Sequence, residues 1–160
     1  MRVLDILTVD RVSVASDAEG TIRNKQDALR RLAELLGRGQ SVLSPDEIEH
    51  VLVAREKLQS TGVGGGVAIP HGAGEPLDRL LGAVLLCPQP IAFDAIDGEP
   101  VSILFAVIGP KRATGEHLKS LARVSKLLRN DGFRAQLLRA PSGREAFDMI
   151  AAEEGRVALP

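Results

Sequence analysis

The chain has 160 residues, of which 44% are apolar and 26% are charged, and its 20 Lys and Arg residues nearly balance its 21 Asp and Glu residues. This length predicts one domain over residues 1–160, and the composition is that of globular proteins rather than of disordered chains. A net charge of −1 and the lack of Trp and Tyr argue against a nucleic-acid partner, because such binding rests on surplus positive charge and on aromatic stacking.

The sequence also argues against export and membrane insertion. The longest apolar stretch without charge, residues 80–93, has 14 residues and contains Pro88 and Pro90, whereas a membrane-spanning helix needs about 20 residues. Charges at positions 2, 5 and 10 interrupt the apolar run that a signal peptide would need. The single cysteine, Cys87, excludes an internal disulfide and fits a reducing compartment. We therefore expect a cytoplasmic protein.

The first elements in the chain are a short strand around residues 11–15 and a helix over residues 25–36. Asn24 is a typical helix cap, leucines then recur at steps of three and four, and Gly37 can end the helix. These signals predict an amphipathic helix that packs on a core.

A second helix is predicted to begin at Pro45, where Ser44 and Glu47 form a capping box. One face of this helix carries an apolar row that also contains an arginine, so we expect Arg55 to point toward the core side rather than into open water. The row consists of Ile48, Val51, Leu52, Arg55 and Leu58.

In the middle of the chain, apolar residues no longer recur with the helical spacing of three and four. Short apolar runs bounded by Gly, Pro and Asp predict buried strands, at residues 67–69, 82–87, 91–93 and 101–108. The helical period returns after Pro110, with Thr114 as the expected cap, and two short helices are expected after Asp131 and after a capping box from Ser142 to Glu145. Together these elements favour an α+β fold, a three-layer α/β/α sandwich with a central mixed β-sheet.

A glycine-rich segment occupies residues 61–67. It matches neither nucleotide-binding motif, since no lysine follows it as a P-loop requires, and position 67 is not the glycine of a dinucleotide fingerprint. The glycines permit a tight turn, a close backbone approach to a ligand, or both, and the sequence leaves these interpretations open for Gly64, Gly65 and Gly66.

Two of the three histidines occupy positions typical of a functional site. His71 lies between Pro70 and Gly72, where a strand passes into a loop. His117 is expected at the third residue of its helix, where free N–H groups attract anions, although a histidine that merely occupies a first turn is an alternative. His50 has polar neighbours and is expected on the surface.

Other site chemistries lack their motifs. The sequence contains no H-E-x-x-H, no paired Cys-x-x-Cys and no G-x-S-x-G, so it predicts neither a metal site nor an acyl-transfer nucleophile, and no cofactor is expected. Cys87 ends an apolar run and is expected in the core. Asp94 and Asp97 lie in a turn-rich segment and are expected to support the turn.

Several blocks of this sequence recur together in one known family. They are Arg55-Glu56-Lys57, the run from Ser60 to Gly72, the run from Pro90 to Gly98, and Glu116-His117-Leu118. With them the chain resembles the fructose/mannitol-type enzyme IIA domain of the bacterial phosphotransferase system, and within it the nitrogen-regulatory branch. The resemblance extends over residues 4–152 and depends most on the block Thr-Gly-x-Gly-x-Gly-x-Ala-x-Pro-His-Gly.

The resemblance implies that His71 accepts a phosphoryl group on Nε2 from a phosphohistidine carrier protein of the HPr type, and that His117 and Arg55 line the same pocket. Arg55 would then supply a fixed positive charge to the phosphate, and His117 a hydrogen-bond donor. The amides of residues 64–66 are candidates for further contacts. The family often has Asn where this chain has Gly65, so a side-chain contact from that position is absent here.

Two functions remain open on this resemblance. One is a carrier in sugar uptake that passes the phosphoryl group to a IIB component. The other is a regulatory module whose phosphorylation state decides which protein it holds, such as a kinase or a potassium transporter. The lack of a IIB or IIC domain and of a membrane segment favours the second. A protein that keeps the fold without transfer is a third alternative, against which the presence of His71, His117 and Arg55 argues.

Overall fold

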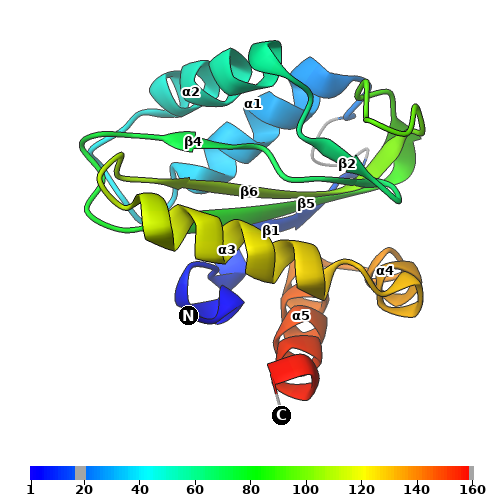
Figure 1. The fold of residues 1–160 in the computed structure, drawn as a ribbon. Coiled ribbons are helices and arrows are strands. Elements are labelled where there is room, and N and C mark those ends of the chain that lie inside the picture. Colours follow the sequence, from blue (N-terminus) through cyan, green and yellow to red (C-terminus); the bar gives the residue numbers. More distant parts are fainter. Residues whose placement is uncertain (17–20, 159–160) are drawn as a thin grey trace.

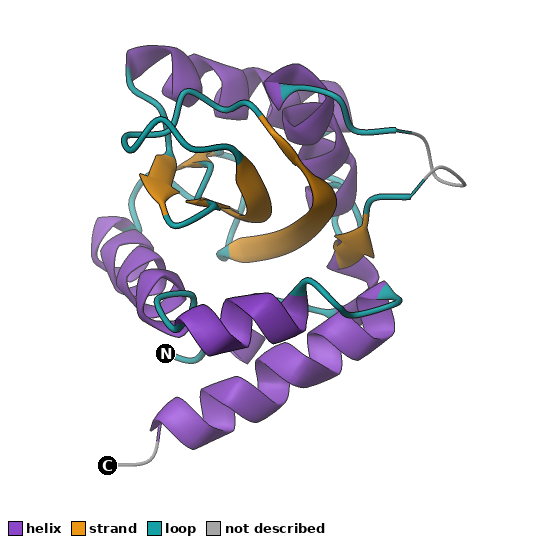
Figure 2. Cartoon of the chain, turned by 90° about the vertical axis from the view of Figure 1, so that its right-hand side faces the viewer, coloured by secondary structure: helices purple, strands orange, loops and turns teal. Residues whose placement is uncertain are grey.

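The computed structural model describes residues 1–16 and 21–158, and within them six strands form one mixed β-sheet between two layers of helices (Figure 1). One face of the sheet is covered by α1 (Lys25–Leu36) and α2 (Pro45–Leu58). The other face carries α3 (Thr114–Leu127), α4 (Asp131–Leu137) and α5 (Gly143–Ala158). Figure 2 shows the two helix layers on opposite sides of the strands. The predicted three-layer sandwich is confirmed.

The strand order is β1-β5-β6-β3-β2, and β4 also pairs with β6. The central pair β5 and β6 is antiparallel, whereas β1, β3 and β4 run parallel to their central partners. The strands are β1 (Val12–Val14), β2 (Gly62–Gly64), β3 (Val67–Ala68), β4 (His71–Ala73), β5 (Leu81–Ile91) and β6 (Val101–Gly109). Because β3 pairs with Ile103 and Leu104 and β4 begins opposite Val107, these two short strands follow one another along β6.

Both central strands bury their two faces. In β6, Leu104 and Ala106 belong to the core formed with α1 and α2, whereas Phe105 and Val107 belong to the core formed with α3, α4 and α5. Successive side chains of a strand point to opposite faces, so a sheet covered on both sides has continuous apolar strands. This explains why unbroken apolar runs in the sequence predicted the central strands.

The starts of α1 and α2 follow the predicted capping signals. The Asn24 side chain accepts the N–H of Asp27 at 2.8 Å, and α1 has the predicted bounds. In α2 the Ser44 hydroxyl accepts the N–H of Glu47 at 3.1 Å, and the Glu47 carboxylate accepts the N–H of Ser44 at 3.0 Å. The predicted capping box is therefore confirmed.

Some predicted details were wrong. Leu58 does not share the inner face of α2 but is 82% exposed, because the helix ends at this residue. The last helix is not short but has 16 residues. Two further strands, β2 and β4, were not predicted, because three residues containing one or two glycines carry no alternating pattern.

The predicted strands at residues 82–87 and 91–93 are one strand, β5, which ends at Ile91. Its pairing with β6 is irregular between Leu86 and Ile91, and residues 88–90 are exposed there. Pro88 and Pro90 lie in this stretch, where a missing N–H costs no ladder hydrogen bond. The prolines thus interrupt the pairing without ending the strand. None of the helices in residues 1–16 and 21–158 is both long enough and apolar enough for a membrane crossing.

Candidate active site around His71

A cavity of about 600 Å³ opens beside His71. This volume lies within the range typical of ligand sites. Its walls come from the end of α2 and the segment that follows, from residues next to β3 and β4, from the segment after β5, and from α3. Representative lining residues are Arg55, Thr61, Ile69, His71, Asp94 and Leu121. The fold thus brings segments far apart in the sequence to one site.

The ring of His71 is held in one orientation by the backbone before it. Nδ1 lies 2.7 Å from the carbonyl oxygen of Ile69. A carbonyl only accepts, so Nδ1 carries the proton and donates, and in the neutral ring Nε2 keeps its lone pair. Among the residues that the structure describes, Nε2 has no hydrogen-bond partner. In the neutral ring, Nε2 is therefore the nitrogen whose lone pair is left unengaged.

Gly72 explains how α2 reaches this site. A Cβ atom at this position would lie 2.4 Å from a side-chain carbon of Val51, so only glycine allows β4 to approach α2 this closely. Val51 and Arg55 lie four residues apart on one side of the helix. The close approach at Gly72 therefore brings Arg55 to the cavity beside His71.

Arg55 is half-buried and lines the cavity, as expected from its helix face. Its Nη1 donates to the carbonyl oxygen of Gln59 at 2.8 Å and so caps the end of α2. A guanidinium has five N–H donors. Arg55 can therefore hold the helix end and still present donors and charge to an anion in the cavity.

The environment of His71 favours its neutral form. Burial is the largest effect and lowers its pKa below the ordinary value of about 6.5. The positive charges of Arg55 and of His117 when protonated lower this pKa too, whereas the hydrogen bond to Ile69 and the charge of Glu56 raise it. The net shift is downward. The lone pair on Nε2 is thus available at neutral pH.

An NMR titration of the His71 ring measures this directly. An unperturbed imidazole is roughly three quarters neutral at pH 7, and we expect a larger neutral fraction for His71 because its pKa is lowered. Loss of the proton from the His71 ring should therefore speed up any reaction at Nε2 as pH rises through a midpoint below about 6.5. A midpoint above that value would contradict the lowered pKa.

His117 differs from its predicted placement. Helix α3 begins at Thr114 itself, with Ala113 as the cap, because the Thr114 hydroxyl bonds back to the carbonyl of Lys111 at 3.4 Å. His117 is thus the fourth helical residue, and its N–H donates to the carbonyl of Ala113 at 2.9 Å instead of being free for an anion. The expectation of a free amide at this residue was wrong.

The His117 ring is also engaged. Its Nε2 lies 3.1 Å from the carbonyl oxygen of Pro110, to which it must donate. The neutral ring therefore presents only an acceptor, Nδ1, and a second donor requires protonation. His117 does not line the cavity wall itself, but Leu121, one turn later in α3, does. The charge of a protonated His117 nevertheless acts on His71. The two histidines are electrostatic neighbours.

The glycine segment lies away from His71. Gly64, Gly65 and Gly66 all have positive φ angles and form the turn between β2 and β3, where the Gly65 N–H donates to the Asp97 carboxylate at 3.1 Å. The carbonyl of Gly66 accepts the N–H of Ile103 on β6. Ile103 lies four residues before Val107, the β6 partner of His71, which is about 13 Å along the strand. This placement gives the predicted backbone contacts from these glycines no support.

Sequence reasoning missed two acidic residues, one next to the cavity wall and one in it. Glu56 is only 8% exposed although charged, and its carboxylate binds Thr61 and Lys25. Its only sequence signal was its place in the family block at residues 55–57. Asp94 has a φ of 56°, rare for a residue other than glycine, and lines the cavity. Such backbone strain is often found at functional sites.

Exposed apolar side chains occur in the cavity wall and on the helix α3 that contributes to it. Val63 and Ile96 line it and are 53% and 77% exposed, and Leu118, next to His117, is 65% exposed. We call these three residues the apolar rim. Exposed apolar groups that gather around a polar site are typical of a protein-docking surface. The exposed apolar area at this site is therefore concentrated on Val63, Ile96 and Leu118.

The other groups considered from sequence take no part in this site. Cys87 is buried in the core, and burial raises its pKa to about 12, so it is not a nucleophile. His50 is exposed on α2. No group of three His, Cys, Asp or Glu residues that could hold a metal ion occurs in the described part of the chain.

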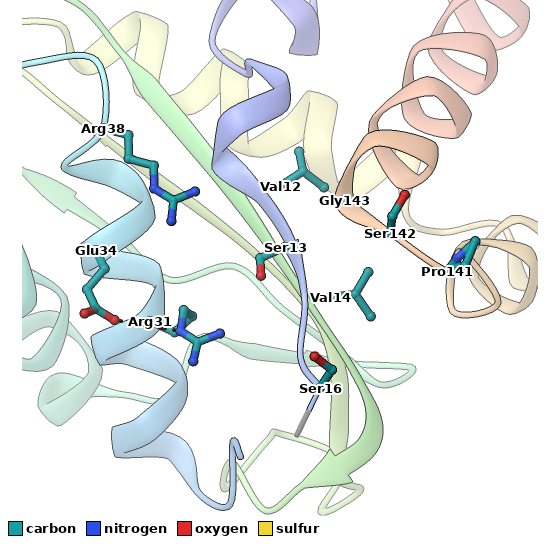
Figure 3. Close-up of a pocket in the computed structure, with 10 residues that line it drawn as sticks. All are labelled: Val12, Ser13, Val14, Ser16, Arg31, Glu34, Arg38, Pro141, Ser142 and Gly143. Carbon is teal, nitrogen blue, oxygen red and sulfur yellow. Dashed lines mark ion pairs between the residues drawn. The ribbon is translucent and has the colours of Figure 1, made fainter. Parts of the chain in front are cut away.

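A second cavity, of about 540 Å³, lies at the opposite edge of the sheet, between β1, α1 and the start of α5 (Figure 3). Arg31 and Glu34 of α1 line it together with Arg38, which follows the helix, so its charge is mixed. It contains no histidine and therefore has no part in chemistry at His71.

Comparison with known proteins shows the family of this chain. Residues 6–153 match the family described as "Phosphoenolpyruvate-dependent sugar phosphotransferase system, EIIA 2". The chain belongs to this family. It is 34% identical over 152 residues to a nitrogen regulatory protein of Bradyrhizobium diazoefficiens, with 95% of each chain covered. A fructose-specific EIIA component of Haloferax volcanii is 30% identical, with 94% of this chain and 97% of that protein covered.

The same family is found among solved structures. The crystal structure of nitrogen regulatory protein IIA-Ntr from Neisseria meningitidis superposes with a TM-score of 0.81 at 35% identity, covering 91% of this chain and 97% of the other. The mannitol IIA protein of Escherichia coli shares the fold, with a TM-score of 0.73 at 20% identity. The family resemblance predicted from the motif blocks is confirmed, and it supports a general phosphotransferase role for this chain.

Proposed function

We propose that this protein is a cytoplasmic phosphohistidine carrier that accepts a phosphoryl group from an HPr-type protein on Nε2 of His71 and serves a nitrogen-type regulatory role. The observation that carries the proposal is the hydrogen bond from Nδ1 to the Ile69 carbonyl, because it leaves the Nε2 lone pair free at a cavity that Arg55 also lines. Membership in the EIIA family supplies the reaction class.

In the transfer step, the Nε2 lone pair of His71 forms a P–N bond as the P–N bond to the carrier's histidine breaks. No proton has to leave His71 beforehand, because the proton already sits on Nδ1 and stays in its bond to Ile69. Phosphoryl transfer gains most from positioning and charge stabilisation. Arg55 provides the fixed charge for the phosphoryl oxygens, and its planar fork suits them.

His117 acts in this scheme only after taking up a proton. Its Nε2–H is already directed to Pro110, so a donor toward the phosphate must be a protonated Nδ1. The charge of an arriving phosphoryl group favours that protonation. The apolar rim then supports docking, since covering Val63, Ile96 and Leu118 excludes water from the transferred group.

Replacing His117 by alanine should slow phosphorylation by about 10- to 1,000-fold, the effect of losing one charge-stabilising donor. The rate of label uptake from the carrier protein measures this. His117→Gln keeps a hydrogen-bond donor without the charge, so its phosphorylation rate should lie between those of His117→Ala and the wild type. An alanine variant with the wild-type rate would show that His117 only packs at the start of α3.

The regulatory role follows from the relatives. Proteins named nitrogen regulatory protein match most of this chain at 34% to 39% identity. In that role the phosphorylation state of His71 decides which protein is held, such as a kinase or a potassium transporter. A second candidate is transport, in which a IIB protein takes the phosphoryl group. The full-length match to a fructose-specific EIIA component favours it.

Incubation with enzyme I, an HPr-type protein and phosphoenolpyruvate tests the regulatory role and the transport role. Label should reach this chain as a phosphate that is labile in acid and stable in base. We then expect no onward movement to fructose or mannitol when membranes with IIB and IIC components are added. Sugar phosphate formed only in the presence of this chain would favour transport. Failure to label the chain at all would refute the proposed function.

A further inference from the structure

We propose that Glu56 is a positioning residue for His71, whose buried carboxylate acts through Thr61 and Ile69 to hold the acceptor that orients the imidazole. The inference rests on the proposed function for what the imidazole does, but the contacts that carry it stand without that function.

The Glu56 side chain is 5% exposed, and its contacts account for its burial. Its two carboxylate oxygens accept the N–H of Thr61 at 3.0 and 3.1 Å, and the Thr61 hydroxyl donates to the same group. Lys25 of α1 donates to it at 2.9 Å. A buried carboxylate is stable only when paired and hydrogen-bonded. Glu56 therefore ties the segment after α2 firmly to the helix.

Two hydrogen bonds continue from Thr61 to the His71 ring, the first between backbone groups and the second from the ring itself. The Thr61 carbonyl accepts the N–H of Ile69 at 2.9 Å. The Ile69 carbonyl in turn accepts Nδ1–H of His71 at 2.7 Å. Pro70, the residue between Ile69 and His71, has a fixed φ and no N–H of its own. A shift of Thr61 is thus passed to the acceptor that decides which ring nitrogen carries the proton.

Glu56 also pairs with nearby positive charges and opposes those that act on His71. Lys25 also lies 3.5 Å from the Asp94 carboxylate and 4.7 Å from the ring centre of Phe93, which places a cation between Glu56 and the segment after β5. Arg55 and His117 are the cations that act on His71, and Glu56 is the anion that opposes them. Groups that fix the tautomer of a functional histidine in this way commonly change activity by about 10- to 100-fold when removed.

The chain contains a matched control. Glu154 of α5 is 4% exposed, accepts the backbone N–H groups of Val3 and Leu4, and lies 3.5 Å from Arg123. It is a buried, hydrogen-bonded carboxylate of the same kind, but on the other face of the sheet. Removing it should reduce stability without acting on His71.

The test compares Glu56→Ala, Glu56→Gln and Glu154→Ala by two-bond ¹H–¹⁵N NMR of the His71 ring and by the phosphorylation rate. In Glu56→Ala we expect a smaller share of the Nδ1–H tautomer and a rate about 10- to 100-fold lower. Glu56→Gln keeps an acceptor for Thr61 but loses the charge, so it should recover most of the tautomer share and show a lower pKa of His71. Glu154→Ala should keep the wild-type tautomer share of the His71 ring.

A wild-type tautomer share and rate in folded Glu56→Ala would overturn the inference, and so would an equal loss of rate in Glu154→Ala. Should Glu56→Ala fail to fold, Glu56→Gln decides, because an unchanged pKa of His71 with an unchanged rate contradicts the role. The ring spectra need no phosphoryl donor. They can therefore contradict this role while labelling of His71 upholds the proposed function, or the reverse.

Discussion

We expect a His71→Gln variant to take up no phosphate from enzyme I, the HPr-type carrier and phosphoenolpyruvate. Glutamine keeps a polar side chain beside the Ile69 carbonyl but has no lone pair of comparable nucleophilicity. Loss of the attacking group in a site of this kind lowers the rate by about 10⁴-fold or more. Acid-labile label on the intact protein, followed over time, measures the effect.

His50→Gln is the matched control for this prediction. His50 is exposed on α2 and makes no contact with the cavity, so this variant should label at the wild-type rate. Label that persists in His71→Gln would mean that another residue accepts the phosphoryl group. A mass measurement of the labelled peptide would then identify that residue.

The second large effect is expected at Arg55. Arg55→Ala removes the fixed charge that lines the cavity beside His71, and transfer should slow by about 100- to 1,000-fold. Arg55→Lys keeps the charge but loses the planar fork, so its rate should lie between alanine and wild type. Initial rates of phosphorylation at several carrier concentrations separate slower chemistry from weaker docking.

Arg55 also caps α2 through Gln59, so thermal unfolding of each variant has to be measured beside its rate. Lys57→Ala serves as the control, because Lys57 is an exposed cation on the same helical turn. It should leave both quantities near wild type. If Arg55→Lys transferred as fast as the wild type, the bidentate role of Arg55 would be wrong and only its charge would matter.

Local chemistry made the first two helices predictable and pointed to the proposed nucleophile. The caps at Asn24 and at Ser44 with Glu47 act within three residues, so the sequence contains all of their partners. His71 was identified in the same way, from its direct neighbours Pro70 and Gly72 and from the family block around it. In each case the determining contacts are short in sequence.

Predictions failed where a partner far along the chain competes with a local pattern. Glu56 was not recognised, because its burial depends on Thr61 after the helix and on Lys25 of another helix. The segment with Gly65 could be a turn or an anion site until Asp97 was found to occupy its amide. His117 looked like a donor, but Pro110 already accepts its proton.

By itself the sequence determined the family, the main helices and central strands, and the residue proposed to carry the phosphoryl group, because periodicity, capping and a contiguous motif are local properties. Only the tertiary structure decided that Nδ1 of His71 holds the proton, that Gly72 lets Arg55 reach it, and that Glu56 is buried behind it. Hydrogen bonds and desolvation act over a few ångströms in space, whatever the separation in sequence, so they are settled only when the chain has folded.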